Sequence, residues 1–281
     1  LTVIWNVYSF AITYMLLDRF NPEEWPLEKV KPYLEVEDRW LLARLQTVIG
    51  KVTGSLERYR FHLAVRELLN FLVEDVSRFY VRLIRKRVWV EAPEMGKMAA
   101  YTVLYRALMD SLKLMAPFTP YLAERLYQAL AVGGPESIHL ADWPKVDPNL
   151  SDEKLERDME VCREALRAAM AARQKGQVKL RWPLKTLIVS PRNVEVKKAL
   201  ERLKSILSSQ ANVKEVQVLG VGETPGFVEV KVKPDLAKIG SRFKSLTSKI
   251  LAELEKIPPA EIERFQREGF LEVEVEDGRV K

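Results

Sequence analysis

A chain of 281 residues in which 47% are hydrophobic and 30% are charged is long enough to bury a substantial core, and this balance is typical of a globular protein. Its single cysteine, Cys162, excludes an intrachain disulfide and a zinc site made of several cysteines, and it favours a reducing, cytoplasmic setting. The formal net charge of +6 favours polyanions as partners.

The first predicted element is a helix that runs from the first residue to about Phe20 and ends at Asn21 and Pro22. Polar residues interrupt its apolar sequence, which argues against a membrane span. The chain starts without Met, without a basic segment and without the cleavage site of a signal peptide. We therefore expect it to begin within a longer protein.

Two long helices are predicted after a connection that contains Pro26 and Pro32. Apolar residues at helical spacing predict the second helix from about Asp38 to Tyr59, and the third from residue 61 to about residue 89. The third helix has a continuous apolar stripe made of Phe61, Val65, Leu68, Leu72, Val76, Phe79 and Leu83. Such a stripe predicts a helix that packs along its whole length against neighbours.

Three further helices complete a predicted bundle. The fourth covers residues 94–115, and the fifth, capped by Thr119, covers residues 119–130. A loop rich in glycine and proline follows, and Ser151 starts a sixth helix that ends near residue 175.

The pattern changes after residue 184. Short β-branched runs predict strands at residues 186–189, 213–219, 227–232 and 270–275. Helices are expected between them at residues 194–207, 243–256 and 259–268. This order resembles a split β-α-β arrangement. We predict a mostly α protein with a helical-bundle domain at residues 1–184 and a small α+β domain at residues 185–281.

The sequence offers no evident catalytic centre. No glycine-rich phosphate-binding loop occurs, so ATP has no recognisable site. The two histidines, His62 and His139, lie far apart and outside the spacing of a helical metal site. We therefore expect no catalytic residue, no metal and no cofactor in this chain.

A first basic stretch occupies the end of the third predicted helix. Its members are Arg78, Arg82, Arg85, Lys86, Arg87 and Trp89. The first three arginines are spaced by four and three residues, so we expect them on one helix face that the tryptophan continues. No acid falls between Val76 and Val90, which suits phosphate binding, while Tyr80 or the tryptophan offers a stacking plane. A solvated helix face partly paired with Glu74 is the alternative.

A second basic stretch extends from residue 163 to residue 185 and contains one acid, Glu164. Its candidate RNA-binding residues are Arg173, Lys175, Lys179, Arg181 and Trp182, and Arg163, Arg167 and Lys185 add further charge. Because RNA recognition needs several phosphate contacts, two such stretches favour RNA binding over a plain charged surface. For both tryptophans of the basic stretches, a place in the core is the alternative.

Several segments resemble those of isoleucyl-tRNA synthetases. Residues 74–85, EDVSRFYVRLIR, resemble the family's E-D-[LV]-S-R-[WF]-Y-V-R-L-[IV]-[RK] segment, which is the most specific match. Residues 38–45, DRWLLARL, are similar to its D-x-W-[IL]-L-[SA]-R-L segment, and residues 113–120, KLMAPFTP, resemble a turn shared by several class I synthetases. Further similar segments are residues 5–10, 137–144, 172–174, 179–184 and, beyond the dense part of the resemblance, 233–243.

The resemblance implies the anticodon-binding bundle of a class I synthetase, whose basic stretches would hold the anticodon stem-loop of tRNA(Ile). In such proteins, which serve protein biosynthesis, upstream catalytic and editing domains attach isoleucine with ATP and Mg. Neither ATP motif of the family occurs here, so the chain alone is expected to be inactive. Bacterial members carry a zinc bound by cysteines, so the single cysteine fits the archaeal or eukaryotic branch.

Two alternatives remain open at this point. One is a non-catalytic RNA-binding or assembly module. The other is the corresponding part of a valyl- or leucyl-tRNA synthetase, since these relatives share the bundle and the Ala-Pro-Phe turn, although the EDVSRFY run favours isoleucine.

Overall fold

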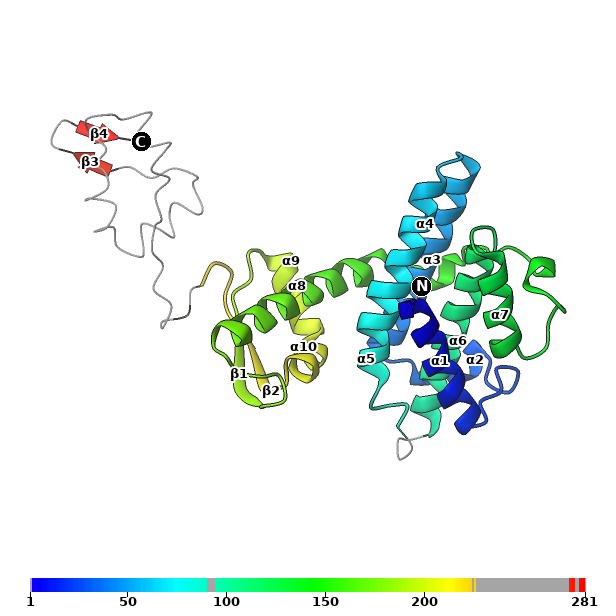
Figure 1. Ribbon diagram of the computed structural model, residues 1–281. Helices are drawn as coiled ribbons and strands as arrows, with labels where there is room; N and C mark the ends of the chain where they lie inside the picture. The colour runs from blue at the N-terminus through cyan, green and yellow to red at the C-terminus, as the bar shows by residue number, and fades with distance from the viewer. Residues whose placement is uncertain (1, 90–93, 224, 226–272, 276–277, 281) are drawn as a thin grey trace.

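The computed structural model describes residues 2–89, 94–223, 225, 273–275 and 278–280 (Figure 1). The strand predicted at residues 227–232 and the helices predicted at 243–256 and 259–268 lie outside the described residues. Within the strand predicted at residues 270–275, β3 (Val273–Val275) pairs antiparallel with β4 (Gly278–Val280). The division into domains at residues 184 and 185 stays a prediction.

The N-terminal part is a bundle of helices, as predicted. Its elements are α1 (Thr2–Leu17), α2 (Leu27–Val30), η1 (Lys31–Tyr33), α3 (Val36–Glu57), α4 (Phe61–Asn70), η2 (Phe71–Tyr80), α5 (Val81–Ile84), α6 (Glu94–Met115), α7 (Pro120–Leu130), η3 (Ile138–Leu140), η4 (Pro148–Leu150) and α8 (Glu153–Lys175). None of the helices in the described ranges is both long and apolar enough to cross a membrane.

The core of the bundle lies around α3 and α6. Both helices bury residues along their whole length, and α1, α4 and α7 pack against α6. The hydroxyl of Tyr8 in α1 is fully buried and donates a hydrogen bond of 2.9 Å to the carbonyl of Leu108 in α6. This bond satisfies a polar group that would otherwise be costly inside the core.

The third predicted helix is continuous only to Ile84. Its central part, η2, is π-helical, and the chain leaves the helix after α5. The N–H groups of Arg87 and Val88 both donate to the carbonyl of Ile84, at 2.8 and 3.0 Å, which closes the helix in a turn. The prediction of a helix that reaches Trp89 is therefore wrong.

Two predicted helix starts differ from the structure in detail. Thr119 is the N-cap residue of α7, with Pro120 in the first turn, but its side chain makes no capping bond to the helix. The N-cap of α8 is Asp152 rather than Ser151, because the Asp152 carboxylate accepts a hydrogen bond of 2.9 Å from the N–H of Leu155. A carboxylate satisfies these free N–H groups as well as a hydroxyl does and also interacts favourably with the helix dipole.

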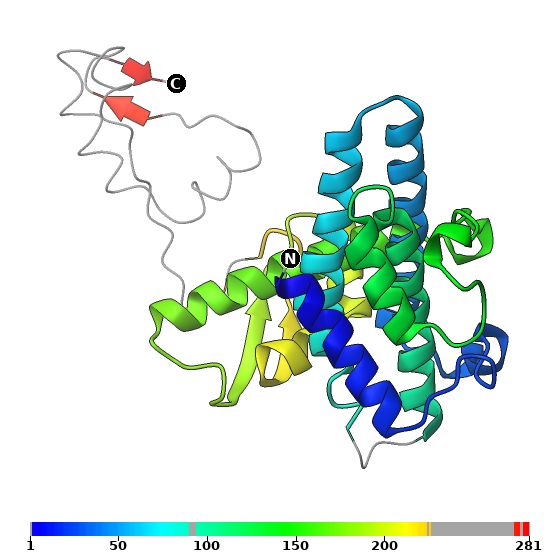
Figure 2. The ribbon, with the colours of Figure 1, turned by 45° about the vertical axis from the view of Figure 1, so that its right-hand side comes forward.

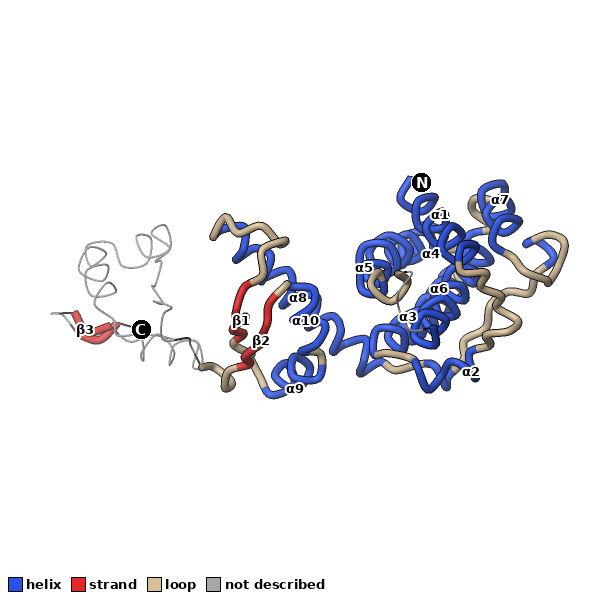
Figure 3. The backbone as a smooth tube through the Cα atoms, turned by 90° about the horizontal axis from the view of Figure 1, so that it is seen from below, coloured by secondary structure: helices blue, strands red, loops and turns tan. Residues whose placement is uncertain are grey.

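A parallel pair of strands follows α8. Strands β1 (Leu184–Val189) and β2 (Val213–Val218) lie side by side, with Leu184 opposite Val213 (Figure 3). Two helices connect them, α9 (Val194–Arg202) and α10 (Lys204–Ala211), in place of the single helix predicted. Both helices pack against α8, which also contacts α3. Helix α8 thus links this unit to the bundle.

Candidate nucleic-acid interface

A groove of about 420 Å³ runs between the helical run η2–α5 and helix α8. Arg78 and Arg82 of the first basic stretch line one side, and Arg163 and Arg167 of the second line the other. Gln210 of α10 also contributes to the lining. The fold therefore brings the first residues of the two basic stretches together in one groove, whereas their later basic residues, from Arg85 in the first and from Arg173 in the second, do not line it.

A buried carboxylate holds the walls of this groove together. Asp75 of η2 is 1% exposed and accepts hydrogen bonds from Arg44 of α3 at 2.9 Å and from Arg163 of α8 at 2.6 Å. Arg163 also lies over the ring of Phe79, 5.1 Å from its centre. Arg44 and Arg163 are thus neutralised inside the protein, and they position the groove rather than supply its free charge.

The accessible charge of the groove comes from three other arginines. Arg82 is exposed, and its guanidinium donates one long hydrogen bond of 3.3 Å to the carbonyl of Gln210. Arg78 pairs with Glu74 at 2.6 Å and Arg167 with Glu160 at 2.8 Å, both at the surface. The pairing of Glu74 with Arg78, which belonged to the alternative of a solvated helix face, is present in the structure. Exposed ion pairs contribute only about 0–1 kcal/mol, so a phosphate can replace these carboxylates.

The turn after α5 carries the next candidates. Arg85 and Lys86 are exposed, and neither has an ion-pair partner within the described parts of the chain. Trp89 follows them and is 57% exposed, so it does not belong to the core. Two cations beside an exposed indole ring are suited to one phosphate and one unstacked base.

Arg87 lies in the same turn but points into the protein. Its guanidinium forms a two-bond pair with the Asp38 carboxylate, at 2.8 and 3.0 Å, and donates 2.9 Å to the carbonyl of Gly96. The carboxylate oxygens of Glu35 and Glu37 lie 3.4 and 3.5 Å from nitrogens of the same guanidinium. The expectation that Arg87 carries unneutralised charge for phosphates is wrong. The carboxylates that neutralise its guanidinium belong to residues 35–38, at the start of α3.

Burial and charge change the acid–base properties of this cluster. Burial by itself lowers the pKa of Arg87, but the hydrogen bond and charge of Asp38 raise that pKa above its ordinary value. Burial raises the pKa of Glu37 to about 7, and the nearby charge of Asp38 adds to this increase. The cluster therefore keeps a permanent cation, Arg87, beside the carboxylates at the N-terminus of α3.

Tyr80 belongs to the same cluster and cannot stack on a base. It is fully buried, and its hydroxyl donates a hydrogen bond of 2.7 Å to Asp38. Burial raises the pKa of Tyr80 well above its ordinary value, so it remains a neutral donor. The stacking role expected for Tyr80 is therefore wrong, because the π-helical segment turns this ring inward.

In the second basic stretch, Arg173 is also a structural residue. It is 7% exposed and donates to the carbonyls of Ala211 and Asn212 at the end of α10, at 2.8 and 2.9 Å. It also donates to the carbonyl of Trp182 at 3.1 Å. A cation at a helix C-terminus satisfies free carbonyls and opposes the negative end of the helix dipole. Arg173 is therefore not available for phosphate.

The other candidates of this stretch remain at the surface. Lys175 and Lys179 are exposed, and Trp182 is 59% exposed. The guanidinium of Arg181 lies 5.6 Å from the centre of the Trp182 ring, a contact that holds a cation next to a flat apolar face. The alternative that Trp182 lies in the core is therefore wrong, as it is for Trp89.

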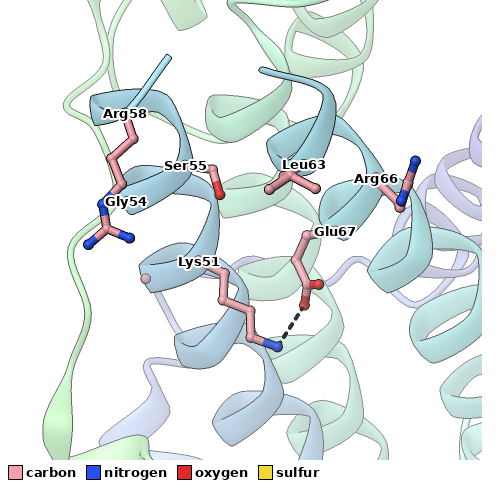
Figure 4. Close-up of a pocket in the computed structure, with 8 residues that line it drawn as sticks. Lys51, Gly54, Ser55, Arg58, Leu63, Arg66 and Glu67 are labelled. Atoms are coloured by element: carbon pink, nitrogen blue, oxygen red, sulfur yellow. Dashed lines mark ion pairs between the residues drawn. The ribbon is translucent and has the colours of Figure 1, made fainter. Parts of the chain in front are cut away.

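Sequence reasoning missed three further cations. Lys51, Arg58 and Arg66 line a second pocket, between the end of α3 and the start of α4 (Figure 4). They are scattered singly among other residues, so no local run of charge marks them. The available signal was that one predicted helix ends near Tyr59 and the next begins at residue 61, because residues on either side of so short a turn face one another.

Known proteins that are similar to this chain are tRNA ligases. Residues 38–188 match the family model described as the anticodon-binding domain of tRNA ligase. The chain is 43% identical to the isoleucine–tRNA ligase of Methanocella arvoryzae, over 99% of this chain and 26% of that protein. It is 43% identical to that of Thermococcus kodakarensis (98% and 25%) and 46% identical to that of Pyrococcus abyssi (90% and 23%). The chain thus spans about a quarter of the length of these relatives.

Proposed function

The chain belongs to the anticodon-binding domain family of tRNA ligases, whose model matches more than half of it, and from this premise we propose that it binds the anticodon stem-loop of an isoleucine tRNA. The observation that carries the proposal is the groove in which Arg78, Arg82 and Arg167 meet. Several accessible cations in one groove can neutralise neighbouring phosphates of one strand.

The exposed candidates divide into two chemical roles. Arg82, with Arg85 and Lys86 beyond the end of α5, would bind phosphates along the stem. Trp89 and Trp182 would stack on bases that are splayed out of the loop, as single-stranded RNA requires. Phosphate contacts orient the RNA without identifying it, so any reading of the anticodon depends on side chains that reach base edges. Lys175, Lys179 and Arg181 extend the charged surface around Trp182.

We further propose that the whole protein is a cytoplasmic isoleucine–tRNA ligase that attaches isoleucine to tRNA(Ile) using ATP with Mg. Its catalytic and editing domains would lie in other parts of the protein, as partners of this chain. The relatives named above support this proposal by name and by identity. A non-catalytic RNA-binding or assembly module, and the same part of a valyl- or leucyl-tRNA synthetase, are the alternatives that the following measurements separate.

Replacing the anticodon triplet is the direct test of the proposed function. We expect the chain to bind an isoleucine tRNA transcript at least tenfold more tightly than the same transcript with another triplet. The physical reason is that a site built for particular base edges leaves polar groups unpaired when other bases enter it. Binding is measured at two salt concentrations. Equal, salt-sensitive binding of both transcripts would contradict anticodon reading and favour a general RNA-binding module.

A substitution tests the role of the first basic stretch. The double variant Arg82→Ala/Arg85→Ala should bind all tRNA transcripts more weakly and should flatten the plot of log affinity against log salt. Each lost phosphate contact is expected to reduce the slope by roughly 0.7–0.9. The matched control is Arg125→Ala/Lys145→Ala, which removes two exposed cations that line none of the described grooves. Unchanged affinity and slope in the first variant would exclude these arginines.

A further inference from the structure

Helices α3 and α4 form an antiparallel hairpin that projects from the bundle (Figures 1 and 2). The chain reverses at Tyr59, whose φ angle of 56° is in the left-handed region. The N–H of Arg60 donates 2.8 Å to the carbonyl of Ser55, which closes the end of α3. The tip is thus a defined turn between two helices rather than a loose loop.

A pocket of about 440 Å³ lies just below this tip (Figure 4). Lys51 and Ser55 of α3 line it together with Arg58, the C-cap residue of α3, and Arg66 and Glu67 line it from α4. An added Cβ at Gly54 would meet nothing within 4 Å, so the backbone there is open to a ligand. The pocket is therefore an open site with a hydroxyl and exposed backbone on one wall.

The pocket carries an excess of positive charge. Its acid, Glu67, is already paired with Arg44 at 2.7 Å and lies 3.6 Å from the Lys51 ammonium. Arg58 and Arg66 are exposed and have no ion-pair partner in the part of the chain that the structure describes. Two unpaired guanidinium groups and an ammonium around one pocket favour an anionic ligand with several oxygen acceptors.

Two aromatic rings extend this surface at the tip. Tyr59 is 81% exposed and Phe61 is 51% exposed, and their rings meet edge to face with centres 6.2 Å apart. Arginines flank the tyrosine on both sides in the sequence. Exposed rings next to cations are the combination on which unpaired bases stack.

The pocket is also continuous with the groove of the proposed function. It shares Lys51 with a neighbouring groove that is lined by α3, η2 and α8. That groove in turn shares Arg163 and Arg167 with the groove between η2–α5 and α8. Arg66 and Arg82 are separated by at most roughly 24 Å at the α-helical rise of 1.5 Å per residue, and by less because η2 is π-helical, a distance that a few nucleotides span. One strand of nucleic acid can therefore reach both ends of this surface.

We propose that the tip of the α3–α4 hairpin is a second RNA-binding subsite, in which Lys51, Arg58 and Arg66 bind a backbone phosphate and Tyr59 stacks on an unpaired base. The inference rests on the proposed function and adds a contact outside the groove. Its charge excess and its continuity with the groove favour RNA over a protein partner. The ligand is a phosphodiester with an unstacked neighbouring base.

The test compares variants of the full 281-residue chain in binding the isoleucine tRNA transcript over a range of salt. The double variant Arg58→Ala/Arg66→Ala should bind roughly fivefold more weakly, and its salt slope should fall by about one, as for one lost phosphate contact. The control Arg125→Ala/Lys145→Ala removes the same charge elsewhere and should retain both affinity and slope. In a phosphate-ethylation interference experiment, the first variant should show one fewer phosphate whose ethylation weakens binding.

The aromatic contact has its own pair of variants. Tyr59→Asn removes the ring and suits the left-handed backbone, so it should weaken binding roughly fivefold to tenfold without changing the salt slope. Tyr59→Phe retains the ring and should bind as the unchanged chain does. A circular dichroism spectrum of each variant verifies that the helical content of the chain is unchanged.

The outcomes separate this inference from the proposed function. If the groove variant Arg82→Ala/Arg85→Ala loses affinity while both hairpin variants bind normally, the subsite is wrong and the proposed function stands. If the unchanged chain does not bind the transcript at all, both are wrong. If the hairpin variants retain RNA binding but lose a protein partner, the tip is a protein-docking surface and the inference is overturned.

Discussion

Replacing Asp38 by Ala is expected to lower the free energy of unfolding by about 3–5 kcal/mol, the range for removing one partner of a buried ion pair. Asp38 is fully buried and pairs with Arg87 through two bonds, the shorter at 2.8 Å. It also accepts from the Tyr80 hydroxyl at 2.7 Å and from the N–H of Glu35 at 2.8 Å. Its loss deprives the Arg87 guanidinium of its two-bond partner and leaves only the longer contacts to Glu35 and Glu37, and it removes the acceptors for the buried Tyr80 hydroxyl and the N–H of Glu35.

Urea unfolding followed by circular dichroism measures this effect, and two milder variants separate its causes. Asp38→Asn removes the charge and retains one acceptor oxygen, so it can accept from either the Tyr80 hydroxyl or the N–H of Glu35 but not from both, and an intermediate loss is expected. Tyr80→Phe removes one hydrogen bond to a charged group and should cost about 1.5–3 kcal/mol. If Asp38→Ala costs less than about 1 kcal/mol, the cluster does not hold the turn that carries Trp89.

Replacing Asp75 by Ala should have an effect of similar size and a second consequence for RNA binding. Asp75 pairs with Arg44 and Arg163, whose side chains are only 14% and 18% exposed, respectively. Without it, Arg44 retains its pair with Glu67, but Arg163 loses its short buried ion pair and lies near a second guanidinium, and a loss of about 3–5 kcal/mol is expected. Because Asp75 joins α3, η2 and α8, the walls of the groove would also separate, and affinity for the transcript should fall at all salt concentrations.

The matched control for Asp75 is Glu153→Ala. Glu153 pairs with Arg157 at 3.2 Å, but both side chains are highly exposed, at 85% and 70%. Surface pairs contribute about 0–1 kcal/mol, so this variant should be nearly as stable as the unchanged chain. Equal losses of stability in the two variants, by urea unfolding, would contradict the structural role assigned to Asp75.

Much of the architecture follows from patterns that are local in the sequence. The apolar stripe from Phe61 to Leu83 predicts a long packed helix because side chains three and four residues apart share a face. Strands β1 and β2 follow from β-branched runs in the same way. The end of the third helix could not be predicted, because Arg87 is held by carboxylates at the start of α3, about fifty residues away in sequence.

The candidate site shows the same limit for charge. The sequence places Arg78, Arg82, Arg85 and Arg87 in one basic stretch. It cannot show which of these arginines are paired, because it reveals only the acidic residues that lie nearby in the chain. The fold exposes Arg82 and Arg85 but pairs Arg87 with Asp38. In the second stretch, it likewise turns Arg173 toward the carbonyls at the end of α10.

By itself, the sequence determined the helical bundle, the presence of strands β1 and β2, the two basic stretches and the resemblance to isoleucyl-tRNA synthetases, since each depends on residues near one another in the chain. Only the tertiary structure decided which cations are free, that the first residues of the two stretches line one groove, and that Lys51, Arg58 and Arg66 line a pocket. The physical reason is that ion pairing and burial act over a few ångströms in space, between side chains that folding brings together from distant segments.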